Sequence, residues 1–288
     1  MAKKDGIIKW DEELAEQAVA SAAMEASTAT GDMFSIKGGI LSFNGAPLPG
    51  NNVAAIIVSA RLHNAFYPDE FNPSKPTNPS CFAFGVDEAA MAPHDQCMKA
   101  DTAECDLCAQ CAKNEWGSAD KGKGKACSNG RRLALISAGV FDNQGRFQAL
   151  DDPKHFADTS IGYLKVPPTS LKGYAAFVKN VALNLKRPPH GVFVKISVVP
   201  DQASQMKVTF ESLGLVPNSI MGEVMARHKE AEGLIEFPYA PYVETSKAEK
   251  RAVAPKAEAA PKASRKAAAQ AEPAGFGAPA AVRKAARY

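Results

Sequence analysis

All six cysteines of this 288-residue chain lie between Cys81 and Cys127, inside a stretch with little hydrophobic periodicity. That stretch, residues 68–130, also holds five prolines and many Gly and Lys residues. A compact domain rarely carries a loop of this length unless something orders it. Because small apolar cysteines rarely gather in a polar loop, we expect a metal ion to order this one.

The spacing of the cysteines is typical of zinc. Two residues separate Cys105 from Cys108 and Cys108 from Cys111, and fifteen residues separate Cys111 from Cys127. A C-x2-C turn lets two thiolates reach one ion, and zinc prefers four tetrahedral ligands. The two turns overlap, so one of these cysteines can be spare, and the spacing alone also admits Cys97. The alternative reading is a set of buried, inert thiols.

We expect the zinc ion to be structural, because it would replace the missing hydrophobic core of the loop. The deaminase pattern H-x-E followed by P-C-x-x-C is absent, since His94 is followed by Asp95 and Gln96. The sequence also lacks H-E-x-x-H, G-x-S-x-G and the Walker phosphate loop. A zinc hydrolase or nuclease would depend on acidic residues that no known spacing joins, namely Asp87, Glu88, Asp95 and Glu104.

The sequence on both sides of the loop predicts a strand-rich domain. Residues 33–67 contain short apolar runs separated by Gly38-Gly39 and the tight-turn dipeptide Asn44-Gly45, which indicates three or four strands. Further apolar runs predict strands at 131–136, 156–166, 191–198 and 206–210. Apolar residues at helical spacing predict helices over 169–186 and 218–232.

These elements indicate an α+β fold. We expect a β-rich, OB-like barrel over residues 31–245, with the zinc loop inserted at 68–130 and helices at its flanks. OB folds are small barrels that bind oligonucleotides. The Ala- and Glu-rich residues 11–27 predict a surface helix in a separate N-terminal segment, residues 1–30.

The last 43 residues differ in composition from the rest. Residues 246–288 hold ten Lys or Arg, three acidic residues and four prolines. They have too little apolar surface to offset the entropy of ordering, so we expect a disordered basic tail. A basic tail on a mildly acidic body suggests a polyanionic partner, although it can also serve only as a solubilising tail. With no long apolar stretch and no signal peptide, we expect a cytoplasmic protein without a membrane partner.

Basic and aromatic residues surround the second half of the cysteine cluster. The candidate nucleic-acid contacts are Lys113, Trp116, Lys121, Lys123, Lys125, Arg131 and Arg132. Basic side chains neutralise phosphates and exposed aromatic rings stack on bases, which are the two elements of single-strand binding. A Lys/Gly run can equally be a solvated loop. Trp116 and Phe84 can instead pack beneath the zinc, and packing is the slightly commoner role.

Four segments together carry a resemblance to a known group of proteins. They are P-x-C-F-A-F-G at 79–85, M-A-P-H at 91–94, C-x2-C-x2-N-x-W-G-S at 108–118 and G-x-G-K-A-C at 122–127. Over residues 30–240 the chain resembles bacteriophage-encoded proteins that are labelled single-stranded-DNA-binding. The resemblance implies that the metal ligands are Cys81, Cys108, Cys111 and Cys127, which leaves Cys97 and Cys105 as extra cysteines.

The resemblance implies a phage replication or recombination protein that binds single-stranded DNA without catalysis and meets phage or host replication proteins. One departure from the pattern of such proteins is the basic tail, because familiar single-strand binders usually end in an acidic tail. A second hypothesis is a zinc-ribbon protein that binds a host protein and modulates transcription or replication. The third is a zinc-dependent nuclease or hydrolase, which needs an open coordination position.

Overall fold

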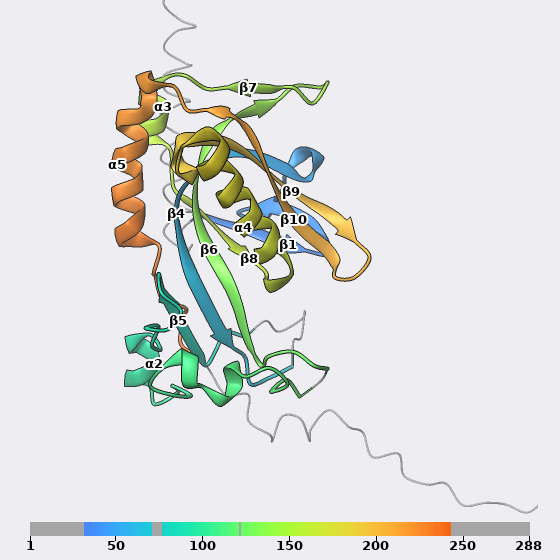
Figure 1. Ribbon diagram of the computed structural model, residues 1–288, viewed down its shortest axis with the longest axis vertical. Helices are drawn as coiled ribbons and strands as arrows, with labels where there is room; N and C mark the ends of the chain where they lie inside the picture. The colour runs from blue at the N-terminus through green and yellow to red at the C-terminus, as the bar shows by residue number, and fades with distance from the viewer. Residues whose placement is uncertain (1–31, 71–76, 121, 243–288) are drawn as a thin grey trace, which may run out of the picture. The chain divides into compact units, whose positions relative to one another are not determined.

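Ten strands form a single mixed sheet in the computed structural model, which describes residues 32–70, 77–120 and 122–242 (Figure 1). The strands are β1 (Asp32–Lys37), β2 (Ile40–Phe43), β3 (Ala46–Pro47), β4 (Asn52–Phe66), β5 (Cys81–Gly85), β6 (Cys127–Phe141), β7 (Phe147–Ala149), β8 (Gly162–Val166), β9 (Val192–Asp201) and β10 (Gln205–Leu215). The strand order is β10-β9-β4-β6-β8-β1-β2-β3, with β5 beside β4 and β7 beside β6. The expected N-terminal helix, Lys121 and the basic tail lie outside the described residues.

Four α-helices lie in the described part of the chain. They are α2 (Asp95–Lys99), α3 (Pro153–Asp158), α4 (Leu171–Asn180) and α5 (Asn218–Leu234), and a π-helical turn, Val181–Leu185, continues α4. Single 3-10 turns lie at Pro49–Asn51, Cys108–Gln110, Ala112–Asn114, Pro168–Ser170 and Pro189–Gly191. Within the part of the chain that the structure describes, no helix has the length and apolar character needed to cross a bilayer.

The α+β class is confirmed, but the expected closure into an OB-like barrel is wrong. The terminal strands β10 and β3 do not pair with each other, so the sheet is open. Only β1 and β8 run parallel, and the other pairs are antiparallel. The physical reason lies in the central strand β4, whose residues are buried on both faces, whereas a small closed barrel buries mainly its interior.

Two hydrophobic layers cover the two faces of the sheet. Ala55 and Ile57 point into the layer that contains α4, while Ile56 and Val58 point into the layer that contains α3 and α5. Successive side chains of a strand point to opposite faces, so this alternation is the expected consequence of extended backbone. We call these the α4 face and the α5 face.

Several local predictions from the sequence are confirmed. Asn44 and Gly45 have φ values of 47° and 84° and form the tight turn between β2 and β3. The hairpin β9–β10 and both long helices form where the patterns place them. The strand predicted over 156–166 is wrong in its first half, because α3 extends to Asp158 and β8 begins only at Gly162. The patterns also missed β7 and, most important for the site, the strand β5 inside the cysteine-rich loop.

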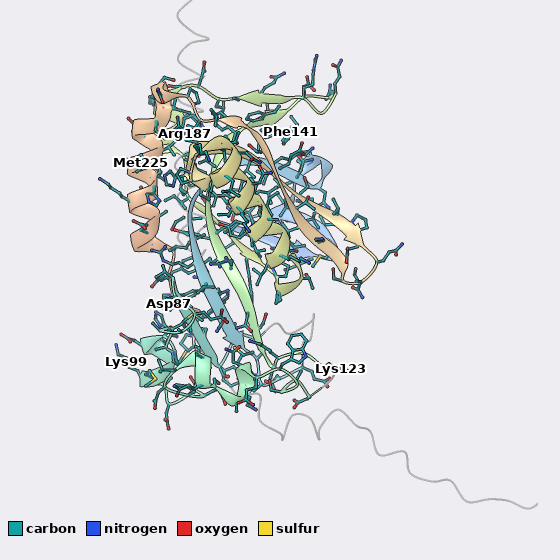
Figure 2. The ribbon with its side chains drawn as sticks, in the orientation of Figure 1. Asp87, Lys99, Lys123, Phe141, Arg187 and Met225 are labelled. Carbon is teal, nitrogen blue, oxygen red and sulfur yellow. The ribbon has the colours of Figure 1, made fainter. Side chains whose placement is uncertain are left out.

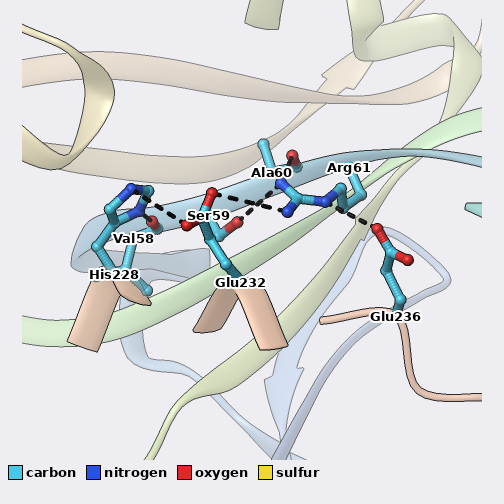
Figure 3. Close-up of polar contacts among 7 residues, drawn as sticks. All are labelled: Val58, Ser59, Ala60, Arg61, His228, Glu232 and Glu236. Carbon is cyan, nitrogen blue, oxygen red and sulfur yellow. Dashed lines mark hydrogen bonds and ion pairs between the residues drawn. The ribbon is translucent and has the colours of Figure 1, made fainter. Parts of the chain in front are cut away.

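Polar contacts fix α5 to the centre of the sheet (Figure 3). The Nδ1 atom of His228 donates a hydrogen bond to the Val58 carbonyl oxygen at 2.6 Å. Nε of Arg61 donates to Oε1 of Glu236 at 2.9 Å, and its NH2 group lies 3.7 Å from Oε1 of Glu232. Arg61 thus ties β4 to the end of α5 from which the chain runs on towards the cysteine-rich part.

At one end of the sheet, β4 and β6 continue beyond the helices and are joined by β5 and α2 (Figure 1). We call this part the cysteine lobe: the ends of β4 and β6, β5, and the described residues between 86 and 126. It contains all six cysteines.

Candidate metal and nucleic-acid site in the cysteine lobe

The strand register brings two distant cysteines to the same face of the sheet. Phe66, the last residue of β4, pairs with Cys81 of β5 on one side and with Cys127 of β6 on the other. Directly paired residues of antiparallel strands project to the same face. A β-bulge between Ile57 and Ser59 shifts the alternation along β4, so that Ala60, and with it Phe66, lies on the α4 face. Both thiols therefore lie on the α4 face, where the 3-10 turn Cys108–Gln110 packs.

Five cysteines line one small cavity. They are Cys81, Cys105, Cys108, Cys111 and Cys127, and the enclosed volume is about 10 Å3. That is room for roughly one water-sized sphere. The four cysteines implied by the resemblance are buried, with side chains between 6% and 9% exposed, whereas Cys105 is half-buried. The sixth, Cys97, packs with Ala65 and Phe82, and its Sγ accepts a hydrogen bond from the Phe82 amide at 3.3 Å.

The thiols share a cavity without forming a finished coordination sphere. Among residues 32–70, 77–120 and 122–242, no group of three or more His, Cys, Asp or Glu side chains is placed to hold a metal ion as it stands. The donor set itself suits zinc, which binds thiolates in sets of four. The C-x2-C pair Cys108 and Cys111 spans a 3-10 turn, with the Cys111 amide donating to the Cys108 carbonyl at 3.4 Å.

Burial and mutual contact keep most of these thiols protonated in the absence of a cation. Burial, and then the neighbouring thiols, raise the pKa of Cys127 to about 12. Burial and a hydrogen bond with Cys111 raise the pKa of Cys105 to about 12. A hydrogen bond with Cys97 is the largest cause of the raised pKa of Cys81, and the same bond lowers the pKa of Cys97 to about 7. A coordinated metal ion would reverse this balance, because it deprotonates its thiol ligands.

Amide groups approach the thiols from the sheet and from the loop. Asn64 is 3% exposed, and its Oδ1 accepts a hydrogen bond from Nδ2 of Asn129 at 2.7 Å. Its own Nδ2 is buried without a hydrogen-bond partner. Burial raises the pKa of Cys108, and the Asn64 amide beside it acts in the opposite direction. A thiolate at Cys108 would supply the acceptor that this amide lacks, as outer-shell donors do at metal sites.

A second amide links the thiols to the basic loop. Nδ2 of Asn114 donates to the Cys108 carbonyl oxygen at 2.7 Å, and Nζ of Lys125 donates to Oδ1 of Asn114 at 3.2 Å. Lys113 lines the thiol cavity, with its Nζ 5.0 Å from the centre of the Phe66 ring. Two cations therefore stand beside the thiols, where they would offset the negative charge of a zinc–tetrathiolate group.

Trp116 projects from the protein instead of packing beneath the cysteines. Its side chain is 78% exposed, the highest value among the large apolar residues of the described chain. We call residues 115–125 the Trp loop, of which the structure describes all but Lys121. The Gly117 amide donates to the Gly124 carbonyl at 2.9 Å, and the Ala126 amide donates to Oγ of Ser118 at 2.9 Å. These bonds tie the base of the loop and hold the ring outward.

The other expected contacts have different surroundings. Lys123 is exposed on the Trp loop (Figure 2), and Lys113, Lys125 and Arg131 are half-buried. Phe84 belongs to the interior of the α5 face, where its ring is stacked on His63 at 5.0 Å between centroids. Packing is therefore the role of Phe84, in contrast to Trp116.

Arg132 is a structural residue and is not available to a phosphate. It is 3% exposed, and its guanidinium lies 4.2 Å from the Phe84 ring centre and 4.0 Å from that of Phe237. Its NH1 group donates to the carbonyl oxygens of Ile235 and Phe237 at 3.1 and 2.8 Å. The strand period explains this placement, because consecutive residues Arg131 and Arg132 must face opposite sides. Arg132 fastens the segment after α5 to the cysteine lobe.

No pattern in the sequence indicated the buried His63 beneath that segment. His63 is fully buried, and its Nε2 is 2.9 Å from the hydroxyl of Tyr239. Burial, followed by the charges of Lys165 and Arg132, holds its pKa well below 6.5. A lone histidine in an apolar run carries no spacing signal, so only the fold reveals it.

The four acidic residues considered for a nuclease do not converge. Glu104 lines the thiol cavity, Glu88 lines a second cavity, and Asp87 and Asp95 line a third of about 480 Å3. The thiol cavity is also too small to admit a substrate beside a metal ion.

Comparison with known proteins adds no assignment. No protein-family model matches this chain, and neither a curated protein nor a solved structure matches it.

Proposed function

We propose that this protein binds single-stranded DNA, with the Trp loop as the main contact and without catalysis. The observation that carries the proposal is the exposed indole of Trp116, held outward on a loop that also presents Lys123. An exposed aromatic ring beside basic side chains is the combination on which single-stranded nucleic acids stack, because every base has a π-face. Lys113 and Lys125 at the base of the loop, and Arg131 on β6, add phosphate-neutralising charge.

A zinc ion held by Cys81, Cys108, Cys111 and Cys127 would fix the base of the Trp loop. These four residues come from β5, from the C-x2-C turn and from β6, so one ion would join three separate segments. The chemistry that zinc supplies here is structural: its binding energy becomes folding energy of the lobe. The chain's own residues, Trp116 and the lysines, make the contacts with the strand.

The resemblance to phage proteins labelled single-stranded-DNA-binding supports a role in phage replication or recombination in the cytoplasm of the infected cell. Phage or host replication proteins are then the expected protein partners. The hypothesis of a zinc-ribbon protein that captures a host protein remains the alternative. It draws support from the exposed Val86 and Met98, 75% and 51% exposed, in the first half of the lobe.

The test is a matched pair of substitutions, Trp116→Ala and Met98→Ala. Both residues are exposed and apolar, but only Trp116 lies on the basic loop. Oligo-dT affinity of the W116A variant should fall by about tenfold at every salt concentration, since stacking contributes about 1–3 kcal/mol per base. The M98A variant should bind as the wild type does. The melting temperature should be unchanged in both, because neither side chain is buried.

Tryptophan fluorescence gives a second readout. The chain has two tryptophans, Trp10 and Trp116, so a Trp10→Phe variant reports on the loop alone. Stacking of a base should quench that signal on titration with oligo-dT. Normal affinity of the W116A variant, or no quenching in the W10F variant, would contradict the proposed contact. A loss of host-protein capture in M98A with intact DNA binding would favour the alternative.

A further inference from the structure

A second cavity, of about 330 Å3, lies on the α4 face between the cysteine lobe and α4. Its floor comes from β6, with Asn129 and Arg131, and one wall comes from the first turns of α4, with Lys172 and Ala175. It is far larger than the thiol cavity and falls in the range of roughly 300–1,000 Å3 typical of small-molecule sites. Neither zinc binding nor the Trp loop accounts for it.

The lining combines cationic and apolar parts. Arg131 and Lys172 bring two positive charges, and Glu88 brings one negative charge. The apolar part includes Leu62, Met91 and Leu171. Convergent polar groups on an otherwise apolar wall are the usual composition of a ligand site. A flat apolar ring with an attached anion would satisfy both parts at once.

The cavity adjoins the thiol site, because the two share a lining residue. Asn64 lines both cavities, and its amide is held by Asn129 at 2.7 Å. Along β6, Cys127, Asn129 and Arg131 alternate onto the same face, so Arg131 lies about 13 Å along the strand from Cys127 at a rise of about 3.3 Å per residue. A polymer that contacts the base of the Trp loop can therefore reach this cavity along one face of the sheet.

We propose that this cavity is a subsite that takes one nucleotide of a bound DNA strand. Its base would lie against Leu171 and Met91, and its phosphate would lie between Arg131 and Lys172. The inference rests on the proposed single-strand binding and adds to it a place where one base is enclosed. Asn129 and Glu88 offer hydrogen-bonding groups to the edge of that base.

Helix α4 provides matched variants that leave the fold intact. Ala175 lines the cavity and its exposed neighbour Ala176 does not, so Ala175→Leu fills the space while Ala176→Leu adds the same side chain outside it. Lys172 lines the cavity, and Lys179 is an exposed lysine in the last turn of the same helix, so Lys172→Ala and Lys179→Ala remove the same charge. Leucine and alanine are both strong helix formers.

The experiment measures binding of the full-length zinc-loaded protein to oligo-dT and to an abasic strand of equal length. The A175L variant should bind oligo-dT about tenfold more weakly than A176L and should bind the abasic strand equally well, because only a base enters the cavity. The K172A variant should show a salt dependence shallower by about 0.7 in log–log slope, and K179A should not.

The outcomes separate the subsite from the function it rests on. Oligo-dT binding that depends on Trp116 but is the same in A175L and A176L overturns the subsite alone. Failure of the wild type to bind oligo-dT overturns both. Saturable binding of free dTMP without oligonucleotide binding would identify a pocket for a free nucleotide, which overturns the strand subsite in favour of a small-molecule site.

Discussion

Trp116 and Arg132 belong to the same basic and aromatic stretch, yet their surroundings are opposite. Trp116 is 78% exposed and Arg132 is 3% exposed. A solvent-held ring can reach a partner without any rearrangement, whereas Arg132 would first have to leave two aromatic rings and two carbonyl oxygens. The burial of a residue therefore decides its role more than its residue type does.

The first prediction concerns an exposed charge. Replacing Lys123 by Ala should lower the slope of log affinity against log salt by about 0.7 on single strands, because one phosphate contact is lost. Lys99 on α2 is the control, since it is also exposed but projects from the other side of the cysteine lobe (Figure 2). Equal slopes for the K123A and K99A variants would mean that Lys123 does not contact the strand.

The second prediction concerns the buried His63. Its pKa in the folded protein is well below 6.5, chiefly because it is buried. Between the folded and unfolded pKa values the unfolded chain binds more protons, so stability should decline as the pH falls below about 6.5. A His63→Phe variant should lose less stability than the wild type between about pH 7.5 and about pH 5. Urea unfolding at both pH values measures this, and parallel losses in the two proteins would show that other groups control acid sensitivity.

At the scale of elements, β5 and the C-x2-C turn form the lobe together. β5 is a five-residue strand that pairs with β4 and begins at Cys81, the residue that the register places across from Phe66. Such a short edge strand has little stability of its own. A metal ion that joins Cys81, the turn at Cys108 and the start of β6 would supply the stability that the strand lacks.

We therefore predict one zinc per chain in the purified protein. Cys108→Ser and Cys127→Ser should each release the metal and unfold the lobe, seen as loss of hydrogen-exchange protection over 81–130. Cys105→Ser is the control, because Cys105 is the half-buried cysteine of the cavity and should leave zinc content unchanged. Full zinc content in both the C108S and C127S variants would eliminate the proposed ligand set.

At the scale of the whole molecule, residues 32–70, 77–120 and 122–242, the part of the chain that the structure describes, belong to one compact unit. The described sheet and its helices contain both large hydrophobic layers.

Truncation after residue 245 should leave the melting temperature nearly unchanged, because the residues of both hydrophobic layers all precede residue 245. The same truncation should weaken nucleic-acid binding more at low salt than at high salt, since ten Lys or Arg residues are lost. Calorimetry and a salt-titrated binding assay check the two parts. A large fall in melting temperature would indicate that the tail docks on the body.

Short-range sequence signals predicted the tight turn and the helices α4 and α5, and the cysteine spacing carries the zinc prediction. Gly and Asn at the hairpin turns, apolar periodicity in α4 and α5, and the C-x2-C spacing are short-range signals, so they can be interpreted without the fold. The strand β5 was not predicted, because its apolar residues lie in a Pro- and Cys-rich context that indicates a loop.

How distant segments meet depends on the three-dimensional fold. Whether the strands close into a barrel depends on long-range pairing, and the doubly buried β4 led to an open sheet covered on both faces. The same pairing placed Cys81 and Cys127 on either side of Phe66, turned Arg131 to one face and Arg132 to the other, and enclosed His63. Register and burial are properties of contacts between residues far apart in the chain, and a residue's own sequence neighbourhood does not contain them.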